Sequence, residues 1–584
     1  MTRLPCLALA AALLLPLLLA TPTAAQWPAD PSVNLPIADR MSEQVTPKIA
    51  SAPNSDTYVA WFDLAAGSYD VYLQRLNSAG VEQWPHNGIL VSDHPQNTSL
   101  VDWDLIADSA GNCVLVFSDV RGAGDLDVQA YKIAPDGTFL WGASGITLSV
   151  STDPEPAPYV AEASDGDFVF VWPRWPNSGG GNIMMQRLAP DGTLRYPAPL
   201  PIAGDPNEQP AFAAIVAADA GSVIASWVRD VTTFSSSRHV RARKFAPDAS
   251  PLWPAHVNVF DAASVPIAYT PKLEPDGAGG TLVLWHRSQS NLYNSLVQHL
   301  SASGTELFPH NGVEVATTAM HHIDPALAYR QATGECFIFW NERNSLQSQW
   351  GIYAQKITAA GARAWGDAGR ELQPVNTIYK SYPRCVQIGD GAAVFYYEEP
   401  TGQFNRDRLL GIRIDASGAL VWPTTPLVVS SYLSSKARIP LTIDAAGVTK
   451  IVWEDDRSGT PDIYGQNVNP DGTLGPSQTA IGGQEPAASV ALLILPNRPN
   501  PFRGLTELGI AAGTALGGNA AFVIADAAGR IVRTIEVPGR ASAGARIAWD
   551  GRNDQGAPLP SGTYFDRLVT PAGESAPQKA TRLR

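Results

Sequence analysis

The sequence is poor in the residues that usually carry metal, redox or nucleophilic chemistry. Its 584 residues include only 4 cysteines, 9 histidines and 5 methionines. It contains no His-Glu-x-x-His motif, no Cys-x-x-Cys motif and no serine in a Gly-x-Ser-x-Gly setting. These absences exclude the zinc proteases, dithiol oxidoreductases and serine hydrolases that carry those motifs. The sequence therefore predicts no catalytic residues, no cofactor and no metal site of those kinds.

Charged residues are also scarce, and their balance is acidic. They make up 16% of the chain, with 41 Lys and Arg against 55 Asp and Glu, a formal net charge of −14. This balance argues against nucleic acid or an anionic membrane surface as a partner. The plentiful residues are turn formers and aromatics, with 50 Gly, 48 Pro and 16 Trp. Such a composition is typical of short strands and turns rather than helices.

The first 25 residues have the pattern of a signal peptide. Arg3 gives a short positive start, residues 7–20 are an unbroken run of Leu, Ala and Pro, and Thr23 and Ala25 fit the small-residue positions before a cleavage site. No later apolar run approaches the length of a membrane span. We therefore expect an exported protein without a transmembrane segment, secreted or at the outer-membrane surface, whose mature chain starts near Gln26.

Three cysteines remain after cleavage, namely Cys113, Cys336 and Cys385. They lie far apart in apolar segments, and three thiols cannot all pair with one another. Buried free thiols are favoured over a disulfide, although the sequence leaves their state open.

A unit of about 55 residues repeats eight times between residues 46 and 475. Two landmarks define it. A turn position recurs every 54 to 57 residues, at Gly80, Gly137, Gly192, Ala249, Gly304, Gly361, Gly418 and Gly472. An aromatic position recurs every 55 to 58 residues, at Trp61, Phe117, Trp172, Trp227, Trp285, Trp340, Tyr397 and Trp453.

Each unit has four short apolar segments separated by hairpin turns such as Pro470-Asp471-Gly472. A second aromatic often follows the turn glycine by four residues, as Trp141 and Trp422 do, and at this spacing it can pack back over that turn. Four antiparallel strands at this period favour one propeller blade over one coil of a solenoid. We predict an all-β protein with a β-propeller of eight blades over residues 26–482. Seven blades, with one divergent unit outside the ring, is the alternative.

The N-terminus also carries a closure signal. Residues 35–44 (LPIADRMSEQ) resemble residues 200–209 (LPIAGDPNEQ), where the last strand of the third unit gives way to the fourth unit. The mature N-terminus therefore offers a spare outer strand, while the last unit ends in a weak stretch. We expect this strand to complete the last blade, which removes both free sheet edges.

The pattern changes after residue 482. Residues 483–491 are rich in small residues and read as a linker. Residues 492–584 alternate short strands with tight turns, which predicts a small Ig-like β-sandwich with Phe502 and Trp549 in its core.

Four motifs in this C-terminal segment carry a family resemblance. They are Pro499-Asn500-Pro501-Phe502, Ile524-Ala525-Asp526 with Gly529-Arg530-Ile531-Val532, Trp549-Asp550-Gly551-Arg552, and Gly556 before Ser561-Gly562-Thr563-Tyr564-Phe565. The segment resembles the FlgD-type Ig-like domain and the sorting domain of bacterial type IX secretion substrates. The resemblance implies export through outer-membrane secretion machinery, with surface attachment or release. A plain accessory Ig-like domain is the alternative, since Lys579-Ala580-Thr581-Arg582 is less apolar than the sorting pattern.

Acidic residues follow the repeat aromatic in several units, including Asp63, Asp119, Glu342, Glu398 and Asp455. They could hold Ca²⁺ or act as paired carboxylates, but repeated carboxylates are more often structural caps. His321, His322 and Asp324 form the other candidate metal group, in a segment between units. We favour structural roles for all of these residues.

Several aromatics lie outside the repeat frame, namely Trp103, Trp175, Tyr293, Trp350 and Phe404. The last four are the candidate binding residues, because exposed aromatics on one face suit sugar stacking or a protein partner. We predict a non-catalytic binding or structural protein whose propeller engages an extracellular glycan or protein. The alternative is a glycoside hydrolase or lyase acting on extracellular polysaccharide, with two carboxylates or an Arg/His/Tyr cluster at the mouth of the propeller.

Overall fold

The computed structural model describes residues 26–94, 101–121, 126–176, 180–203, 208–230, 237–266, 270–476, 494–510, 520–526, 530–537, 545–570, 573–574 and 578–583. The chain divides into two compact units, Met1–Ala480 and Ile481–Arg584. The segments expected to be a signal peptide, residues 1–25, and a linker, residues 483–491, lie outside the described residues.

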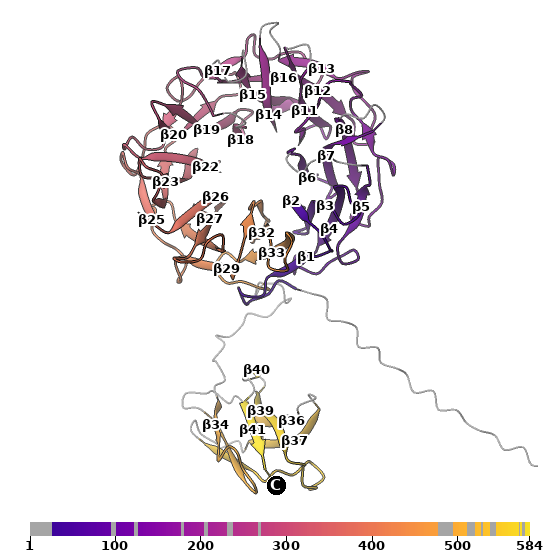
Figure 1. Cartoon of the computed structure of the whole chain (residues 1–584), viewed down its shortest axis with the longest axis vertical. Coiled ribbons are helices and arrows are strands. Elements are labelled where there is room, and N and C mark those ends of the chain that lie inside the picture. The colour runs from indigo at the N-terminus through magenta and orange to yellow at the C-terminus, as the bar shows by residue number, and fades with distance from the viewer. Residues whose placement is uncertain are drawn as a thin grey trace, which may run out of the picture. The chain divides into compact units, whose positions relative to one another are not determined.

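The first unit is a ring of β-sheets (Figure 1). Its described residues form eight sheets and a single 3₁₀ turn, Asp219–Gly221. The fold is therefore all-β, as the sequence predicts, and each of the eight repeats corresponds to one sheet.

Seven of these sheets contain four consecutive antiparallel strands that pair in chain order, with the first strand on the inside of the ring (Figure 1). Their strands are β2 (Gln44–Ser51), β3 (Thr57–Asp63), β4 (Asp70–Leu76) and β5 (Ile89–Ser92); β6 (Asp104–Ala107), β7 (Cys113–Val120), β8 (Leu126–Ile133) and β9 (Ile146–Thr147); β10 (Tyr159–Glu162), β11 (Phe168–Arg174), β12 (Asn182–Leu188) and β13 (Leu200–Ala203); β14 (Gln209–Ala217), β15 (Val223–Asp230), β16 (His239–Phe245) and β17 (Val257–Phe260); β18 (Lys272–Pro275), β19 (Thr281–Gln289), β20 (Leu292–Leu300) and β21 (Val313–Glu314); β22 (His321–Arg330), β23 (Glu335–Arg343), β24 (Trp350–Ile357) and β25 (Arg370–Asn376); and β26 (Tyr379–Ile388), β27 (Gly391–Glu399), β28 (Asp407–Ile414) and β29 (Leu427–Ser434).

The eighth sheet joins the two ends of the ring. It combines β30 (Lys436–Ala437), β31 (Leu441–Ile443), β32 (Thr449–Asp455) and β33 (Asp462–Val468) with β1 (Leu35–Ala38) from the N-terminal side. Strand β1 pairs with β33 in antiparallel register, with Leu35 opposite Gly465. The expected closure by an N-terminal outer strand is confirmed, and it covers the edge that β33 would otherwise expose.

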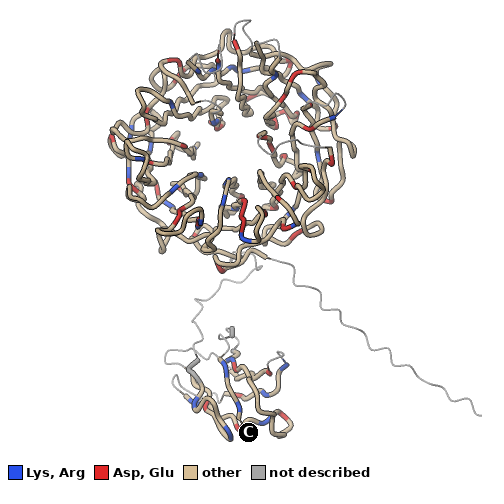
Figure 2. The backbone as a smooth tube through the Cα atoms, viewed as in Figure 1, with Lys and Arg blue, Asp and Glu red and all other residues tan. Residues whose placement is uncertain are grey.

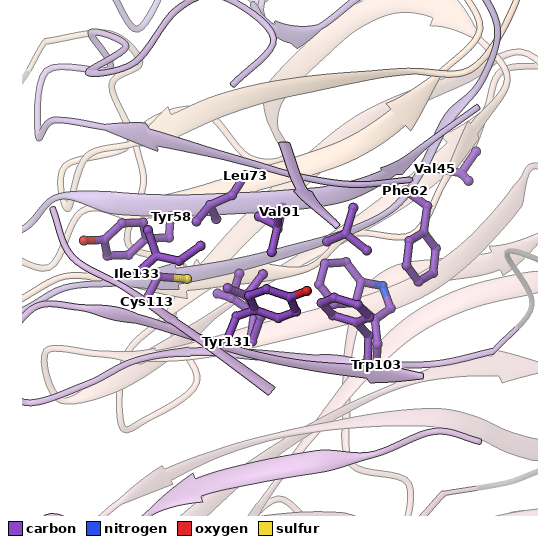
Figure 3. Packing of buried hydrophobic residues seen from close by; sticks show 14 of the residues in the cluster. Val45, Tyr58, Phe62, Leu73, Val91, Trp103, Cys113, Tyr131 and Ile133 are labelled. Carbon is purple, nitrogen blue, oxygen red and sulfur yellow. The ribbon is translucent and has the colours of Figure 1, made fainter. Parts of the chain in front are cut away.

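Apolar side chains fill the spaces between neighbouring sheets. Figure 3 shows one such cluster, in which Tyr58 and Phe62 of β3 meet Trp103 and Tyr131 of the next sheet. Because each second strand is enclosed by two neighbouring sheets, β3 is buried at every position. Cys113 lies in this cluster, and Cys113, Cys336 and Cys385 are all free thiols, the first two of them buried.

The aromatic that follows each turn packs differently from the sequence-based expectation. Trp422 lies over Gly472 of the following unit rather than over its own turn, and its indole N–H donates to the Pro470 carbonyl at 3.1 Å. Trp141 makes the corresponding bond to Pro190 at 3.2 Å. A Cβ on Gly472, whose φ is +86°, would come within 2.7 Å of the Trp422 ring. The correction follows from the blade packing, because each aromatic joins its blade to the next.

The C-terminal unit is a β-sandwich of two sheets. One sheet contains β34 (Ile494–Arg498), β35 (Thr506–Ile510) and β38 (Arg546–Trp549), and the other contains β36 (Ala520–Asp526), β37 (Ile531–Val537), β39 (Gly562–Thr570), β40 (Gly573–Glu574) and β41 (Gln578–Arg582). Phe502 and Trp549 are buried in its core with ring centroids 5.2 Å apart, as the sequence predicts.

Candidate functional site

The loops that join the second and third strands of the sheets emerge on one face of the ring. In each sheet the start of the first strand, the end of the second and the start of the third lie at the same end, as Gln44, Asp63 and Asp70 do in the first sheet. We call this end the upper face. Lys and Arg are interspersed with Asp and Glu around the whole ring (Figure 2), so a local imbalance of charge must come from individual loops.

A cavity of about 340 Å³ opens among three consecutive sheets, β18–β21, β22–β25 and β26–β29, at their upper ends. Its walls are mainly aromatic and polar. The lining residues are His286, Tyr293, Ile323, Asp324, Arg343, Gln347, Tyr379, Ser381 and Tyr382.

Two of these residues occupy a strained backbone position. Asp324 and Tyr382 have φ values of 53° and 52°, and each lies at a register shift between the first and second strands of its sheet. Thr46 and Phe212 occupy the same kind of bulge in other sheets. Bulges re-aim side chains, and non-glycine residues adopt this conformation only where the surroundings impose it. The scaffold therefore repeats the bulge, and the residue placed on it differs from sheet to sheet.

The cavity contains a positive charge without an acidic partner. Arg343, at the end of β23, donates from Nε to Asn341 Oδ1 at 2.5 Å and from Nη1 to Gln347 Oε1 at 3.5 Å. Among the described residues it forms no ion pair, whereas Arg384 pairs with Asp324 at 3.3 Å. Burial lowers the pKa of Arg343, but a guanidinium stays protonated at any physiological pH. Asp324, the carboxylate of the cavity lining, also acts electrostatically on Arg343, so Arg343 and Arg384 together exceed it by one positive charge.

A neutral imidazole faces the same cavity. Burial lowers the pKa of His286 to about 4, and the positive charge of Lys272 acts in the same direction, while Asp324 opposes it. His286 is therefore uncharged at neutral pH. Its ring lies edge to face against Tyr293, with centroids 6.1 Å apart.

His321 contacts Tyr293 but is not among the residues that line the cavity. Its Nδ1 accepts from the Tyr293 backbone N–H at 3.3 Å, and its Nε2 donates to the Ser345 carbonyl at 3.4 Å. Both ring nitrogens are thereby used, and the pair of bonds fixes the tautomer and holds Tyr293 in place.

Two tyrosines form the opposite wall. Tyr382 is 45% exposed and its ring lies 6.2 Å from that of Tyr397, edge to face. Partial burial raises the pKa of Tyr382, so its hydroxyl keeps its proton. Tyr379 packs edge to face against Trp350 at 5.1 Å. The cavity thus combines the Arg343 cation, the Asp324 carboxylate, a neutral imidazole and the protonated phenol of Tyr382.

The structure places the four candidate binding residues at different points. Tyr293 lines the cavity, and Trp350 stands behind it, cross-strand to Arg343 and against Tyr379. Phe404 is 91% exposed on the loop between β27 and β28. Trp175 packs against Phe212 at 6.4 Å and is not among the cavity residues. Trp103, also outside the repeat frame, is fully buried.

The repeated carboxylates have structural partners. Trp453 Nε1 donates to Asp455 Oδ2 at 2.9 Å, and the same carboxylate contacts Lys436 at 3.2 Å and Arg457 at 2.6 Å. Asp119 pairs with Arg121 at 2.9 Å. In the part of the chain that the structure describes, no group of three His, Cys, Asp or Glu side chains is arranged to hold a metal ion.

Sequence reasoning missed His286, Arg343, Tyr379 and Tyr382 as a group. The acid two positions after the repeat aromatic is replaced by arginine in the units of Trp172, Trp227 and Trp285. This departure includes one of the cavity units but does not single it out.

The C-terminal unit matches a known family. Residues 508–567 match the FlgD Ig-like domain. No curated protein matches the sequence. No helix among the described residues is long and apolar enough to cross a bilayer.

The solved structures with similar folds include sugar-active proteins, all remote. A polysaccharide lyase, an ulvan lyase bound to a GlcA(1-4)Rha3S ligand, aligns with a TM-score of 0.44 and 12% identity over 76% of this chain and 97% of its own. The polysaccharide lyase Uly1 aligns with a TM-score of 0.39 and 11% identity, covering 73% and 90%. The α-L-arabinanase of Penicillium chrysogenum bound to arabinobiose aligns with a TM-score of 0.34 and 11% identity, covering 58% and 99%.

Proposed function

We propose that the propeller binds an anionic extracellular polysaccharide in the cavity among β18–β29 and cleaves it by β-elimination. The observation that supports this most directly is Arg343, a half-buried guanidinium that forms no ion pair among the described residues, in the same cavity as neutral His286 and three tyrosines. A guanidinium fork suits a sugar carboxylate, which it can bind through two parallel hydrogen bonds.

The residue types favour elimination over hydrolysis. Glycoside hydrolysis commonly uses two carboxyl groups on either side of the bond to be broken. The cavity has one carboxylate, Asp324, and that group is engaged by Arg384 at 3.3 Å. Elimination at a uronate needs instead a group that neutralises the carboxylate, a base and a proton donor, and the cavity offers all three.

Each group then has a role in the reaction. Arg343 binds the uronate carboxylate and makes the hydrogen on the adjacent C5 more acidic. His286 accepts the C5 proton, Tyr382 donates a proton to the glycosidic oxygen on C4, and the C4–O bond breaks as the C4=C5 double bond forms. Burial is the main cause of the low pKa of His286, and a bound carboxylate opposes the smaller contributions of Lys272 and Arg343.

A non-catalytic binding protein, the function predicted from sequence, would use the same ligand and the same cavity but release no product.

The proposal also places the protein outside the cell, with residues 1–25 as signal peptide, 26–482 as propeller, 483–491 as linker and 492–584 for export or surface attachment. Mass spectrometry of the culture supernatant tests whether the C-terminal domain is removed during export. Peptides from beyond residue 490 in the secreted form would contradict its removal.

The function is tested on the full mature chain with alginate, polygalacturonate, hyaluronan and chondroitin sulfate. We expect one of them to yield an unsaturated product, measured by its ultraviolet absorbance, and Arg343→Ala to reduce kcat/KM by about a hundredfold or more. Arg370→Ala, at an exposed site in the outer strand β25, is the matched control and should behave as wild type. Binding without product would leave the non-catalytic function, and neither binding nor product on any polymer would overturn the proposal.

A further inference from the structure

The loop between β27 and β28 presents an aromatic ring that the fold does not need. Phe404 is 91% exposed, the most exposed of the large apolar residues that the structure describes. An exposed phenylalanine contributes no core packing, and a ring held in water is suited to stacking on a ligand.

Hydrogen bonds hold this loop in place. The backbone N–H of Asn405, next to the ring, donates to Glu399 Oε2 at 2.6 Å, and Gln403 donates from its N–H to the Pro400 carbonyl at 3.0 Å. Ser435, which lies between β29 and β30, donates from Oγ to Asn405 Oδ1 at 3.4 Å. The ring is therefore presented by a braced turn, which reduces the entropy lost when a ligand stacks on it.

The bond between Asn405 and Glu399 also connects the loop to the strand that faces the cavity residue Tyr379. Glu399, which binds Asn405, lies directly opposite Tyr379 in the β26–β27 ladder. Side chains at such cross-strand positions have Cβ atoms about 5 Å apart. Tyr379 lines the cavity, so the loop that carries Phe404 is linked to the cavity wall through the Glu399–Tyr379 pair.

A positive charge accompanies the ring. Arg406, two residues after Phe404, donates from Nη1 to the Leu433 carbonyl at 3.5 Å and forms no ion pair with a described residue. The loop therefore repeats, outside the cavity, the combination of aromatic surface and unpaired guanidinium found inside it.

We infer that Phe404 and Arg406 form a second sugar-binding subsite, in which the ring stacks on a pyranose face and the guanidinium pairs with the acidic group of that sugar. The inference rests on the proposed function and extends it, because it makes the substrate a polymer bound across the cavity and the loop together. Affinity should then increase with chain length up to the point at which both are filled.

The test uses the full mature chain with oligogalacturonide and alginate disaccharides and octasaccharides. We expect Phe404→Ala to weaken octasaccharide binding by about threefold to tenfold and to leave disaccharide binding unchanged. Arg343→Ala should weaken both, while Phe404→Trp should keep the octasaccharide affinity. Leu252→Ala, a control at a half-exposed apolar residue in the loop between β16 and β17 on the opposite face, should change neither.

The two proposals fail in different ways. If Arg343→Ala weakens binding but Phe404→Ala has the same affinity as wild type for both lengths, the subsite is overturned and the proposed function stands. Equal weakening of both lengths by Phe404→Ala would also overturn the subsite, since the ring would then act on the cavity itself. If no oligosaccharide binds and Arg343→Ala changes nothing, the proposed function fails and the subsite with it.

Discussion

The indole N–H of Trp27 donates a 3.2 Å hydrogen bond to the carbonyl of Ser78, in the turn of the first complete repeat. Trp141, Trp253 and Trp422 make the equivalent bond to the turn of the sheet that follows theirs. The last repeat has no aromatic four residues after its turn glycine, because Pro476 occupies that position. Trp27 supplies the missing ring, so the N-terminal segment contributes both a strand and an aromatic link to the closure.

Replacing Trp27 should open this closure. Trp27 is 1% exposed, and removing a buried tryptophan typically costs about 3–5 kcal/mol. We expect Trp27→Ala to lower the midpoint of urea unfolding of the propeller, measured by fluorescence, far more than Trp175→Ala, whose ring is partly exposed. Equal midpoints for the two variants would show that β1 closes the ring without the aromatic link.

The ring could be predicted from the sequence because its construction is periodic. The segment LPIA forms both β1 and β13, and both are outer strands, so the likeness of the two segments is enough to predict the closing strand. Periodicity could not tell which turn Trp422 covers, since its own turn and the next lie at fixed spacings from it. Only the packing of blades decides between them.

The site could not be predicted in the same way. His286, Arg343 and Tyr382 come from three different repeats, and a repeat pattern identifies what units share rather than what one unit has alone. Tyr293 can be predicted as a candidate because it stands outside the repeat frame. Tyr382 cannot, because its exposure depends on a bulge with φ of 52°, which the sequence does not reveal.

The repeated carboxylates should behave as parts of the scaffold. Asp455 lies between Lys436 and Arg457, and both Asp455 and Lys436 have no exposed side-chain surface. Removing one partner of a buried ion pair typically costs about 3–5 kcal/mol, because the other charge stays buried. We expect Asp455→Asn to lower the urea midpoint strongly while oligosaccharide affinity, measured well below that midpoint, is unchanged. A folded Asp455→Asn protein with lost affinity would give this carboxylate a place in the site.

Arg343 should act through the shape of its guanidinium as well as its charge. A lysine keeps the positive charge but cannot form two parallel hydrogen bonds to a carboxylate. We expect Arg343→Lys to weaken uronate binding by about tenfold, roughly 1.4 kcal/mol, and Arg343→Gln to weaken it further. The affinity of wild type should also fall with added salt, and that dependence should be smaller in Arg343→Gln. Titration calorimetry at two salt concentrations measures both effects, and equal salt dependence would contradict a direct ion pair.

The low pKa of His286 should make this residue a source of acid instability. In the unfolded chain an imidazole has a pKa of about 6.5, whereas burial lowers the pKa of His286 to about 4 in the folded protein. Between these two values the unfolded state binds the extra proton, so the free energy of unfolding falls as the pH is lowered from about 6.5 to about 4. Above about pH 6.5 both states are neutral and His286 contributes no pH dependence.

His286→Gln isolates this contribution, because other buried groups titrate in the same range with the opposite sign. Burial raises the pKa of Glu342 to about 7, so this carboxyl makes the folded state lose stability as the pH rises. Glu342 is common to wild type and variant, so its effect cancels in their difference. We expect His286→Gln to gain on the order of 1–3 kcal/mol relative to wild type between pH 7 and pH 4.5, measured by urea unfolding at both values. A difference that does not change with pH would mean that His286 titrates alike in the folded and unfolded states, and would remove the neutral base from the proposed site.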